Sequence, residues 1–146
     1  MEPHITKKIK EDSVYFTIYW SKIEKVNKYE IIRRVPSVAG IYELYYMDEK
    51  KKLNLFFFSK AWYGGLRAKI RQDIDPSLDE NKKKIKILNK FTCYYRYSIV
   101  ESNDDMDDIL FFFSETYFPE KNLYEPSGIY VDIYVKEISP EKVITI

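Results

Sequence analysis

Alternation of apolar and polar positions marks the strands that the sequence predicts. Between Phe91 and Val100 the odd-numbered residues are all apolar or aromatic, so this segment is predicted to form a strand. Segments 40–46 and 53–58 are rich in β-branched and aromatic residues and enclose a charged run at 48–52, which predicts a hairpin. Two more strands are expected, at 14–20 and 128–138.

Apolar residues at three- and four-residue spacing predict helices between these strands. The longest helix is expected at about 104–118, with Ser102 as its N-cap. A shorter helix is predicted over 66–74, after two glycines. A further helix is expected within 21–35, where Ser21 would be the N-cap and Glu24, three residues on, would complete a capping box.

Residues 79–90 are dominated by lysine and are predicted to form a loop with one or two helical turns, in which Ile85 and Leu88 face inward. The full order is then strand, helix, hairpin, helix, strand, helix, strand. This order predicts an α+β domain with a small, mainly antiparallel sheet flanked by helices. Because chains of 146 residues rarely divide, residues 1–146 are expected to form a single domain.

Composition excludes several kinds of chemistry. The chain has one cysteine, Cys93, and one histidine, His4, which is too few for an internal disulfide or a zinc site of about four ligands. A Ser-His or Cys-His catalytic pair would depend on His4, close to a chain end. No segment approaches the roughly 20 apolar residues that cross a bilayer, and no signal-peptide layout is present. We therefore expect a cytoplasmic protein with no membrane partner.

Net charge gives no support for general binding of polyanions, because 24 basic residues are nearly balanced by 23 acidic ones. Any nucleic-acid interface must therefore be local. Basic side chains gather around two large aromatic residues in a predicted loop, a combination suited to phosphates and stacked bases. The candidate contacts in this region are Lys60, Trp62, Tyr63, Arg67, Lys69 and Arg71.

Four motifs follow one another in the middle of the chain. Residues 35–42 read Val-Pro-Ser-Val-Ala-Gly-Ile-Tyr, and residues 56–61 read Phe-Phe-Phe-Ser-Lys-Ala. Residues 65–70 read Gly-Leu-Arg-Ala-Lys-Ile, and the segment 100–122 ends in Pro-Glu-Lys-Asn. In this order they resemble the GIY-YIG nuclease domain of excision-repair nucleases and homing endonucleases, over about residues 35–122. The resemblance implies a GIY-YIG-like core with an N-terminal strand-helix extension and a C-terminal strand.

The catalytic residues that the resemblance implies are only partly present. It places Tyr42 at the first catalytic tyrosine and Asn122 at the family's asparagine. Phe57 and Ser59, however, occupy the positions of the second tyrosine and of the motif glycine. Leu110 occupies the position of the metal-binding glutamate, and an isobutyl group cannot hold a divalent cation. The domain is therefore expected to be catalytically inactive, with no cofactor.

An alternative is a divergent Mg²⁺-dependent endonuclease with displaced catalytic residues. The family's arginine corresponds to Lys69 if two residues are inserted before the helix, and to Arg67 if they are not. Asp107, one turn before the expected metal ligand, is a weak substitute for it, and Glu115, about 140° further round the helix, is a weaker one. Tyr42 would then act with Lys69 or Arg67.

The leading interpretation is a degenerate nuclease fold that serves as a nucleic-acid-binding or interaction module. DNA or RNA would contact the basic and aromatic residues named above, together with Asn122. A second alternative is a protein-interaction or homodimerisation domain with no nucleic-acid role, in which Trp62 and Tyr63 meet the partner. Tyr42 and Asn122 also have structural interpretations, as a core tyrosine and as the end of a turn.

Overall fold

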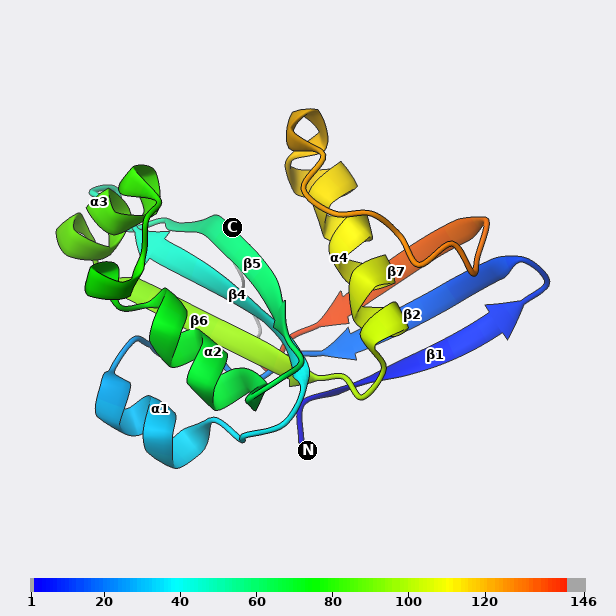
Figure 1. Ribbon diagram of the computed structural model, residues 1–146, viewed down its shortest axis with the longest axis horizontal. Helices are drawn as coiled ribbons and strands as arrows, with labels where there is room; N and C mark the ends of the chain where they lie inside the picture. Colours follow the sequence, from blue (N-terminus) through cyan, green and yellow to red (C-terminus); the bar gives the residue numbers. More distant parts are fainter. Residues whose placement is uncertain (1, 142–146) are drawn as a thin grey trace.

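Seven strands form one curled sheet within residues 2–141, the part of the chain that the computed structural model describes (Figure 1). The strands are β1 (His4–Lys10), β2 (Ser13–Tyr19), β3 (Glu24–Lys25), β4 (Gly40–Met47), β5 (Leu53–Ala61), β6 (Cys93–Ile99) and β7 (Asp132–Ile138). The helices are α1 (Lys28–Arg34), α2 (Gly65–Asp73), α3 (Lys82–Lys90) and α4 (Asn103–Tyr117), with 3-10 turns η1 (Pro76–Leu78) and η2 (Pro119–Lys121). The fold is α+β, as predicted.

The strand order is β5-β4-β6-β1-β2-β7, with the short β3 paired to β6. The predicted hairpin of β4 and β5 is confirmed, and β4 also pairs antiparallel with β6. The sequence does not predict β1, which forms a second hairpin with β2. β2 pairs in parallel with β7, and β1 meets the end of β6 in parallel. The sheet is therefore mainly antiparallel, with β1 joining its two halves.

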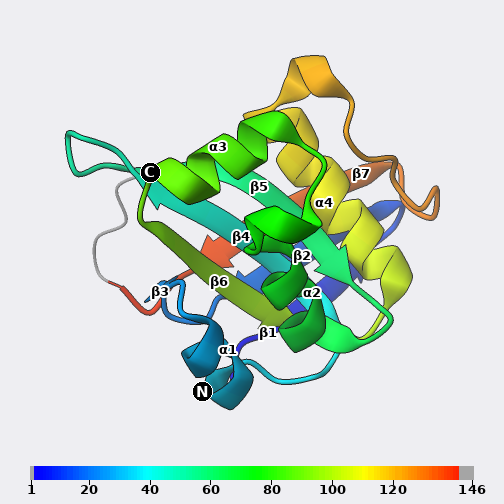
Figure 2. The same cartoon turned by 60° about the vertical axis from the view of Figure 1, so that its left-hand side comes forward.

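Helices cover the two faces of the sheet in different places (Figure 2). α1 and α2 lie over one face of β4 and β6, which buries Tyr42, Leu44 and Tyr95 and is called here the α2 face. α4 lies over the opposite face, called here the α4 face, and packs with Ile41, Phe58 and β2. Because successive side chains of a strand point to opposite faces, consecutive residues of β4 belong to different cores.

The N-terminal helix begins later than the sequence predicts, and the predicted capping box is wrong. α1 begins at Lys28 and is capped by the side chain of Asn27. Ser21 instead accepts a hydrogen bond from the backbone nitrogen of Tyr97, and Glu24 lies in β3. Pairing with β6 satisfies backbone groups of this segment, so the extended conformation prevails over the helical one.

The lysine-rich segment after η1 contains more helix than predicted. α3 extends over nine residues and is capped by the side chain of Asn81. Ile85 and Leu88 were expected to face inward but are only half-buried, whereas Lys84 is buried. A lysine is rarely buried unless its charge is matched, and here the carboxylates of Asp73 and Asp79 supply that match.

Two glycines allow close backbone approach near Tyr42. A Cβ atom on Gly40 would lie 2.4 Å from the carbonyl oxygen of Ser98, so a side chain here would push β4 away from β6. Gly65 has a φ of +78°, and its Cβ would lie 2.5 Å from the carbonyl carbon of Ser37. Gly40, in the Gly-Ile-Tyr motif, and Gly65, the first residue of α2, therefore each have a structural reason to be glycine.

The predicted N-cap of α4 is confirmed, because the Ser102 hydroxyl accepts a hydrogen bond from the backbone nitrogen of Asp105. The last strand begins later than predicted, at Asp132, after a segment in which the nitrogen of Val131 donates to the carbonyl of Asp12. Among the helices of residues 2–141, none is both long and apolar enough to cross a membrane.

Candidate functional site

Tyr42, the tyrosine of the Gly-Ile-Tyr motif, is fully buried on the α2 face. Its hydroxyl donates a hydrogen bond to Oδ2 of Asp73, at the C-terminal end of α2. Burial, the negative charge of Asp73 and this hydrogen bond together raise the pKa of Tyr42 well above its usual value. The hydroxyl is therefore held protonated in a closed position, which favours the structural interpretation of this tyrosine.

Asp73 is the centre of a polar cluster, called here the Asp73 cluster. It lies 3.1 Å from Nζ of Lys84 and 3.4 Å from Nζ of Lys69. Lys84 also lies 2.8 Å from Oδ2 of Asp79, and its side chain is only 5% exposed. The hydrogen bond from Lys84 holds the pKa of Asp79 below its usual value. Two carboxylates therefore match the charge of this buried lysine.

Phe57, which stands where the resemblance expects a catalytic tyrosine, lies beside the Asp73 cluster. Its ring centroid is 6.2 Å from that of Tyr42, on the neighbouring strand. The ammonium group of Lys84 lies 4.0 Å from the centroid of the same ring, within the range of a cation–π interaction. The structure thus brings Tyr42, Phe57 and Lys69 together and places Lys84 and Asp73 beside them.

Arg67 and Arg71, the other candidates on α2, are placed differently. Nε of Arg67 donates a hydrogen bond of 2.8 Å to the backbone carbonyl of Val35, which fixes the start of α2 against the segment before β4. Arg71 is exposed and lines a pocket of about 550 Å³ together with Lys28. Of the two positions left open by the sequence, Lys69 is the one that shares a carboxylate with Tyr42.

Lys60 lies on the face of the β4–β5 hairpin opposite to Tyr42, because it pairs across the hairpin with Ile41. Its Nζ lies 2.5 Å from Oδ1 of Asp107, the weak substitute for a metal ligand. Leu110 is fully buried in the core of the α4 face. The position that the resemblance assigns to a metal ligand is therefore in a different core from Tyr42.

No group of three or more His, Cys, Asp or Glu side chains within residues 2–141 is arranged to hold a metal ion. The carboxylate that does reach Tyr42 is Asp73, from α2 and not from α4. It is already shared with two lysines, Lys69 and Lys84. The arrangement is that of an ion-paired structural cluster.

The remaining candidates are exposed and lie outside the Asp73 cluster. Tyr63 is 92% exposed and Trp62 is 43% exposed, in the connection between β5 and α2. Asn122 is exposed and ends η2 with a φ of 46°, a left-handed conformation that asparagine adopts more readily than most residues. Its position at the end of a turn agrees with the structural interpretation.

A pocket of about 220 Å³ opens between β5, α3 and η2, and is called here the Phe57 pocket. Its walls combine aromatic rings and lysines with a few apolar and amide groups, and no carboxylate lines it. The aromatic residues are Tyr46, Phe56, Phe57 and Phe118, and the lysines are Lys83, Lys84 and Lys121. The pocket therefore places lysine side chains beside aromatic rings.

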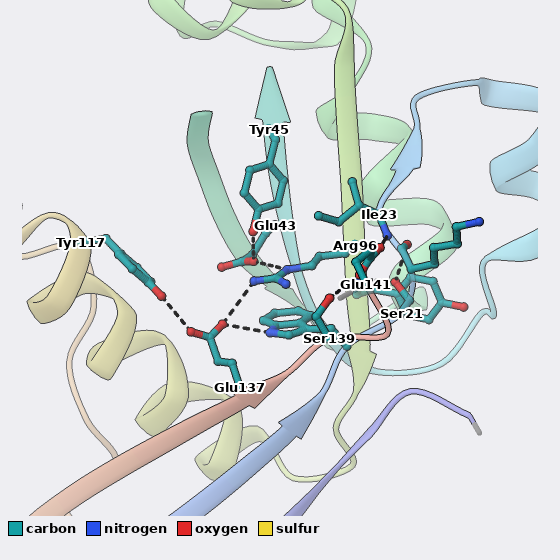
Figure 3. A network of polar contacts seen from close by, with 12 residues as sticks. Ser21, Ile23, Glu43, Tyr45, Arg96, Tyr117, Glu137, Ser139 and Glu141 are labelled. Atoms are coloured by element: carbon teal, nitrogen blue, oxygen red, sulfur yellow. Dashed lines mark hydrogen bonds and ion pairs between the residues drawn. The ribbon is translucent and has the colours of Figure 1, made fainter. Parts of the chain in front are cut away.

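A second buried ionic network, the Arg96 network, occupies the α4 face (Figure 3). Nε of Arg96 lies 2.6 Å from Oε1 of Glu43, and Nη2 lies 3.3 Å from Oε1 of Glu137. The hydroxyl of Tyr45 donates to the same Glu43 oxygen at 2.5 Å. Burial raises the pKa of Glu43 above its usual value, while the charge of Arg96 acts in the opposite direction.

Two more side chains complete the Arg96 network through Glu137 (Figure 3). Nε1 of Trp20 donates to Oε1 at 2.9 Å, and the hydroxyl of Tyr117 donates to Oε2 at 2.8 Å. The Arg96 guanidinium also lies 4.4 Å from the centroid of the Trp20 ring. Arg96 and Glu43 are buried, and every charged group of the network has more than one partner, so we interpret the network as structural.

Sequence reasoning missed Asp73, Lys84 and Arg96. A local signal exists only for Asp73, which lies four residues after Lys69 and so on the same side of α2. Lys84 lies in a run of lysines in which nothing distinguishes it from its neighbours. Arg96 occupies one side of an alternating strand, and its partner Glu43 is 53 residues away.

Comparison with known proteins gives a family for this chain. Residues 4–146 match the model of a protein family described as "Uncharacterised protein", and the chain belongs to that family. No curated protein and no solved structure matches the chain. The family match begins at β1 and includes β7, so it extends over both halves of the sheet.

Proposed function

We propose that this chain carries a degenerate GIY-YIG-like domain that binds single-stranded nucleic acid without cleaving it. The observation that carries the proposal is the Phe57 pocket, where aromatic rings and lysines meet and no carboxylate is present. Bases stack on aromatic side chains, and lysines attract phosphates. A pocket with both features suits a single-stranded nucleic acid, because the bases of a single strand can unstack from one another and stack on protein side chains.

The size of the pocket limits what can enter it. Its volume of about 220 Å³ is below the range of about 300–1,000 Å³ that is typical of pockets for drug-sized molecules. It therefore suits one base, with the attached phosphates outside. Lys84 is already paired with Asp73 and Asp79, whereas Lys83 and Lys121 form no ion pair with residues of the described part of the chain. We assign the phosphate contacts to Lys83 and Lys121.

Three features support binding without cleavage. The Phe57 ring has no hydroxyl to exchange a proton, and the Tyr42 hydroxyl is buried against Asp73. Leu110 lies in the core where the resemblance expects a metal-binding carboxylate. In the nuclease family that the motifs resemble, hydrolysis of the phosphodiester needs an accessible tyrosine, a basic residue and a metal-binding carboxylate, and here Tyr42 is buried and Leu110 replaces the carboxylate.

Fluorescence anisotropy with labelled single-stranded DNA and RNA tests the proposal. The wild-type chain should bind both at low salt and lose affinity steeply as salt is raised, because binding releases counterions. Replacing both phosphate contacts, Lys83→Gln with Lys121→Gln, should reduce the slope of log affinity against log salt by about 1.4, which is about 0.7 for each lost contact to a single strand. Lys22→Gln with Lys25→Gln, around β3, is the matched control and should change little.

Three results would contradict this function. The first is a wild-type protein that binds no single strand at low salt, and the second is a pocket variant that behaves like the β3 control. The third is nicking of supercoiled DNA in Mg²⁺ that is abolished by Tyr42→Phe, which would establish the endonuclease alternative. A Phe56→Ala variant separates stacking from charge, because it should weaken binding without changing the salt slope.

A protein-interaction role remains the second candidate, and the observation that favours it is the exposure of Tyr63 and Trp62. Large aromatic side chains commonly anchor interfaces when they become buried by a partner. Replacing both by alanine should abolish capture of such a partner and leave single-strand binding at the Phe57 pocket unchanged. Loss of nucleic-acid binding in this variant would instead place the aromatic loop in the nucleic-acid interface.

A further inference from the structure

The far edge of the sheet is formed by β7, which pairs on one side with β2 (Figure 1). Nothing in the described part of the chain pairs with its other side. Four of its seven residues are exposed: Asp132, Tyr134, Lys136 and Ile138. An unpaired strand edge offers a row of backbone donors and acceptors to a further strand, and proteins usually protect such edges.

We infer that β7 pairs with β7 of a second copy of this chain, antiparallel across a two-fold axis at Tyr134. A two-fold axis perpendicular to the sheet makes the same strand its own antiparallel partner, so one edge serves both copies. The two sheets then continue into one another, with α4 of each copy on the same side. This inference does not depend on nucleic-acid binding.

Charge complementarity along β7 supports this register. With the axis at Tyr134, residues whose numbers add up to 268 lie opposite each other, so Asp132 of each copy faces Lys136 of the other. Opposite charges directly across an antiparallel pair are favourable, and the symmetry makes this pair occur twice. Both residues are exposed on the same face as Tyr134.

Other registers lose this match. Moving the axis by one residue to Val135 places Lys136 opposite Tyr134 and Asp132 opposite Ile138. Moving it to Ile133 places Asp132 opposite Tyr134. Neither arrangement pairs the two charged side chains, so the sequence of β7 is self-complementary in one of these three registers.

Both faces of β7 agree with the same register. On the outer face, Tyr134 is stacked on Tyr15 of β2, with ring centroids 4.9 Å apart and an interplanar angle of 15°. Pairing at Tyr134 brings two such stacks side by side, and aromatic cross-strand pairs are favourable. On the inner face, Ile133 of one copy lies opposite Val135 of the other, and both are half-buried apolar residues packed against the core.

Analytical ultracentrifugation of the full chain tests the inference. The mass should rise with concentration from one chain of 17.6 kDa to twice that value. Asp132→Lys and Lys136→Asp should each raise the dimer dissociation constant about tenfold or more, because each places like charges opposite one another twice. Lys8→Asp, on the same face but two strands from the edge, is the matched control and should leave the constant unchanged.

Charge exchange distinguishes this interface from a general loss of stability. An equimolar mixture of the Asp132→Lys and Lys136→Asp chains should dimerise like the wild type, because both cross-strand pairs are again of opposite charge. The double variant carrying both changes should also dimerise alone. A chain that stays monomeric at all concentrations overturns the inference. So does a dimer that Lys136→Asp leaves unchanged, since that dimer uses another surface, or a mixture that shows no recovery.

Discussion

Tyr42 and Glu43 are neighbours on β4, yet they belong to two ionic clusters of different character on opposite faces of the sheet. In the Arg96 network, Arg96 and Glu43 are 3% and 1% exposed and are enclosed by Trp20 and Tyr45. In the Asp73 cluster, the charges are likewise paired, but Lys84 forms part of the wall of the Phe57 pocket. One cluster is closed by the core, and the other borders a cavity.

The difference shows how buried charge can serve two purposes in one small fold. The Arg96 network joins β4 and β6 to β7, so it ties together the two halves of the sheet. The ion pair between Lys84 and Asp73 joins α3 to α2, and it fixes the position of a lysine that lines the Phe57 pocket. Breaking the first should therefore act on the stability of the fold, and breaking the second should act mainly on the pocket.

The largest effect is expected for Arg96→Met. This change leaves Glu43 and Glu137 as carboxylates without their cation, and removing one partner of a buried ion pair costs about 3–5 kcal/mol. Urea unfolding followed by circular dichroism measures the loss. Glu43→Gln combined with Arg96→Met should recover part of it, because the amide removes the unpaired charge. A loss below about 1 kcal/mol would show that the network contributes little.

A smaller effect is expected for Asp73→Asn. Lys84 keeps its second carboxylate, Asp79, so we expect the free energy of unfolding to fall by about 1–3 kcal/mol, which is the range for leaving a buried polar group poorly satisfied. The variant should also weaken single-strand binding, because α3 loses its link to α2. Glu49→Gln, at an exposed position in the turn between β4 and β5, is a control and should change neither quantity. A greater loss of stability than in Arg96→Met would reverse the comparison.

Local patterns predicted the parts of the fold that depend on local physics. Alternation located β6, and composition located the β4–β5 hairpin. Helical spacing and the Ser102 cap located α4. Each of these signals lies within one element, because a strand or an amphipathic helix shows its buried face in its own sequence.

The parts that could not be predicted depend on distant partners. β1 reads His-Ile-Thr-Lys-Lys-Ile-Lys and is a strand because β2 pairs with it along its whole length. Serine is a common helix N-cap, but Glu24 and Lys25 pair with β6, and the Ser21 hydroxyl accepts a hydrogen bond from the backbone of that strand instead. In each case tertiary pairing overrides a weaker local preference.

Some residues of the candidate site could likewise be predicted from the sequence, and others could not. The motif resemblance brought attention to Tyr42, Phe57 and Lys69, which the structure does place together. It gave no sign of Lys84, whose burial follows from Asp73 on another helix. A residue's charge can be read from the sequence, but the partner that lets it be buried cannot.

Removing a single hydroxyl from either cluster should lower the free energy of unfolding by about 1 kcal/mol, and by a similar amount in both clusters. Tyr42→Phe removes a donor to Asp73, and Tyr45→Phe removes a donor to Glu43. Each carboxylate keeps a cation, so the loss should be close to the usual net value of one hydrogen bond, about 0.5–1.5 kcal/mol. Urea unfolding of both variants checks this. A much larger loss in one variant than in the other would show that the two clusters do not respond alike.

A further effect appears only at alkaline pH and involves two residues on the α2 face of β6. Burial raises the pKa of Cys93 from 9.0 to about 11 and that of Tyr95 from 10.0 to about 12. Above pH 9 the unfolded chain releases the Cys93 proton while the folded chain keeps it, so the free energy of unfolding falls as pH rises towards 11. Cys93 contributes at most about 1.4 kcal/mol per pH unit to this slope. Cys93→Val should flatten the slope by up to that amount when urea unfolding is measured across this range, and an unchanged slope would show that the thiol does not titrate differently in the two states.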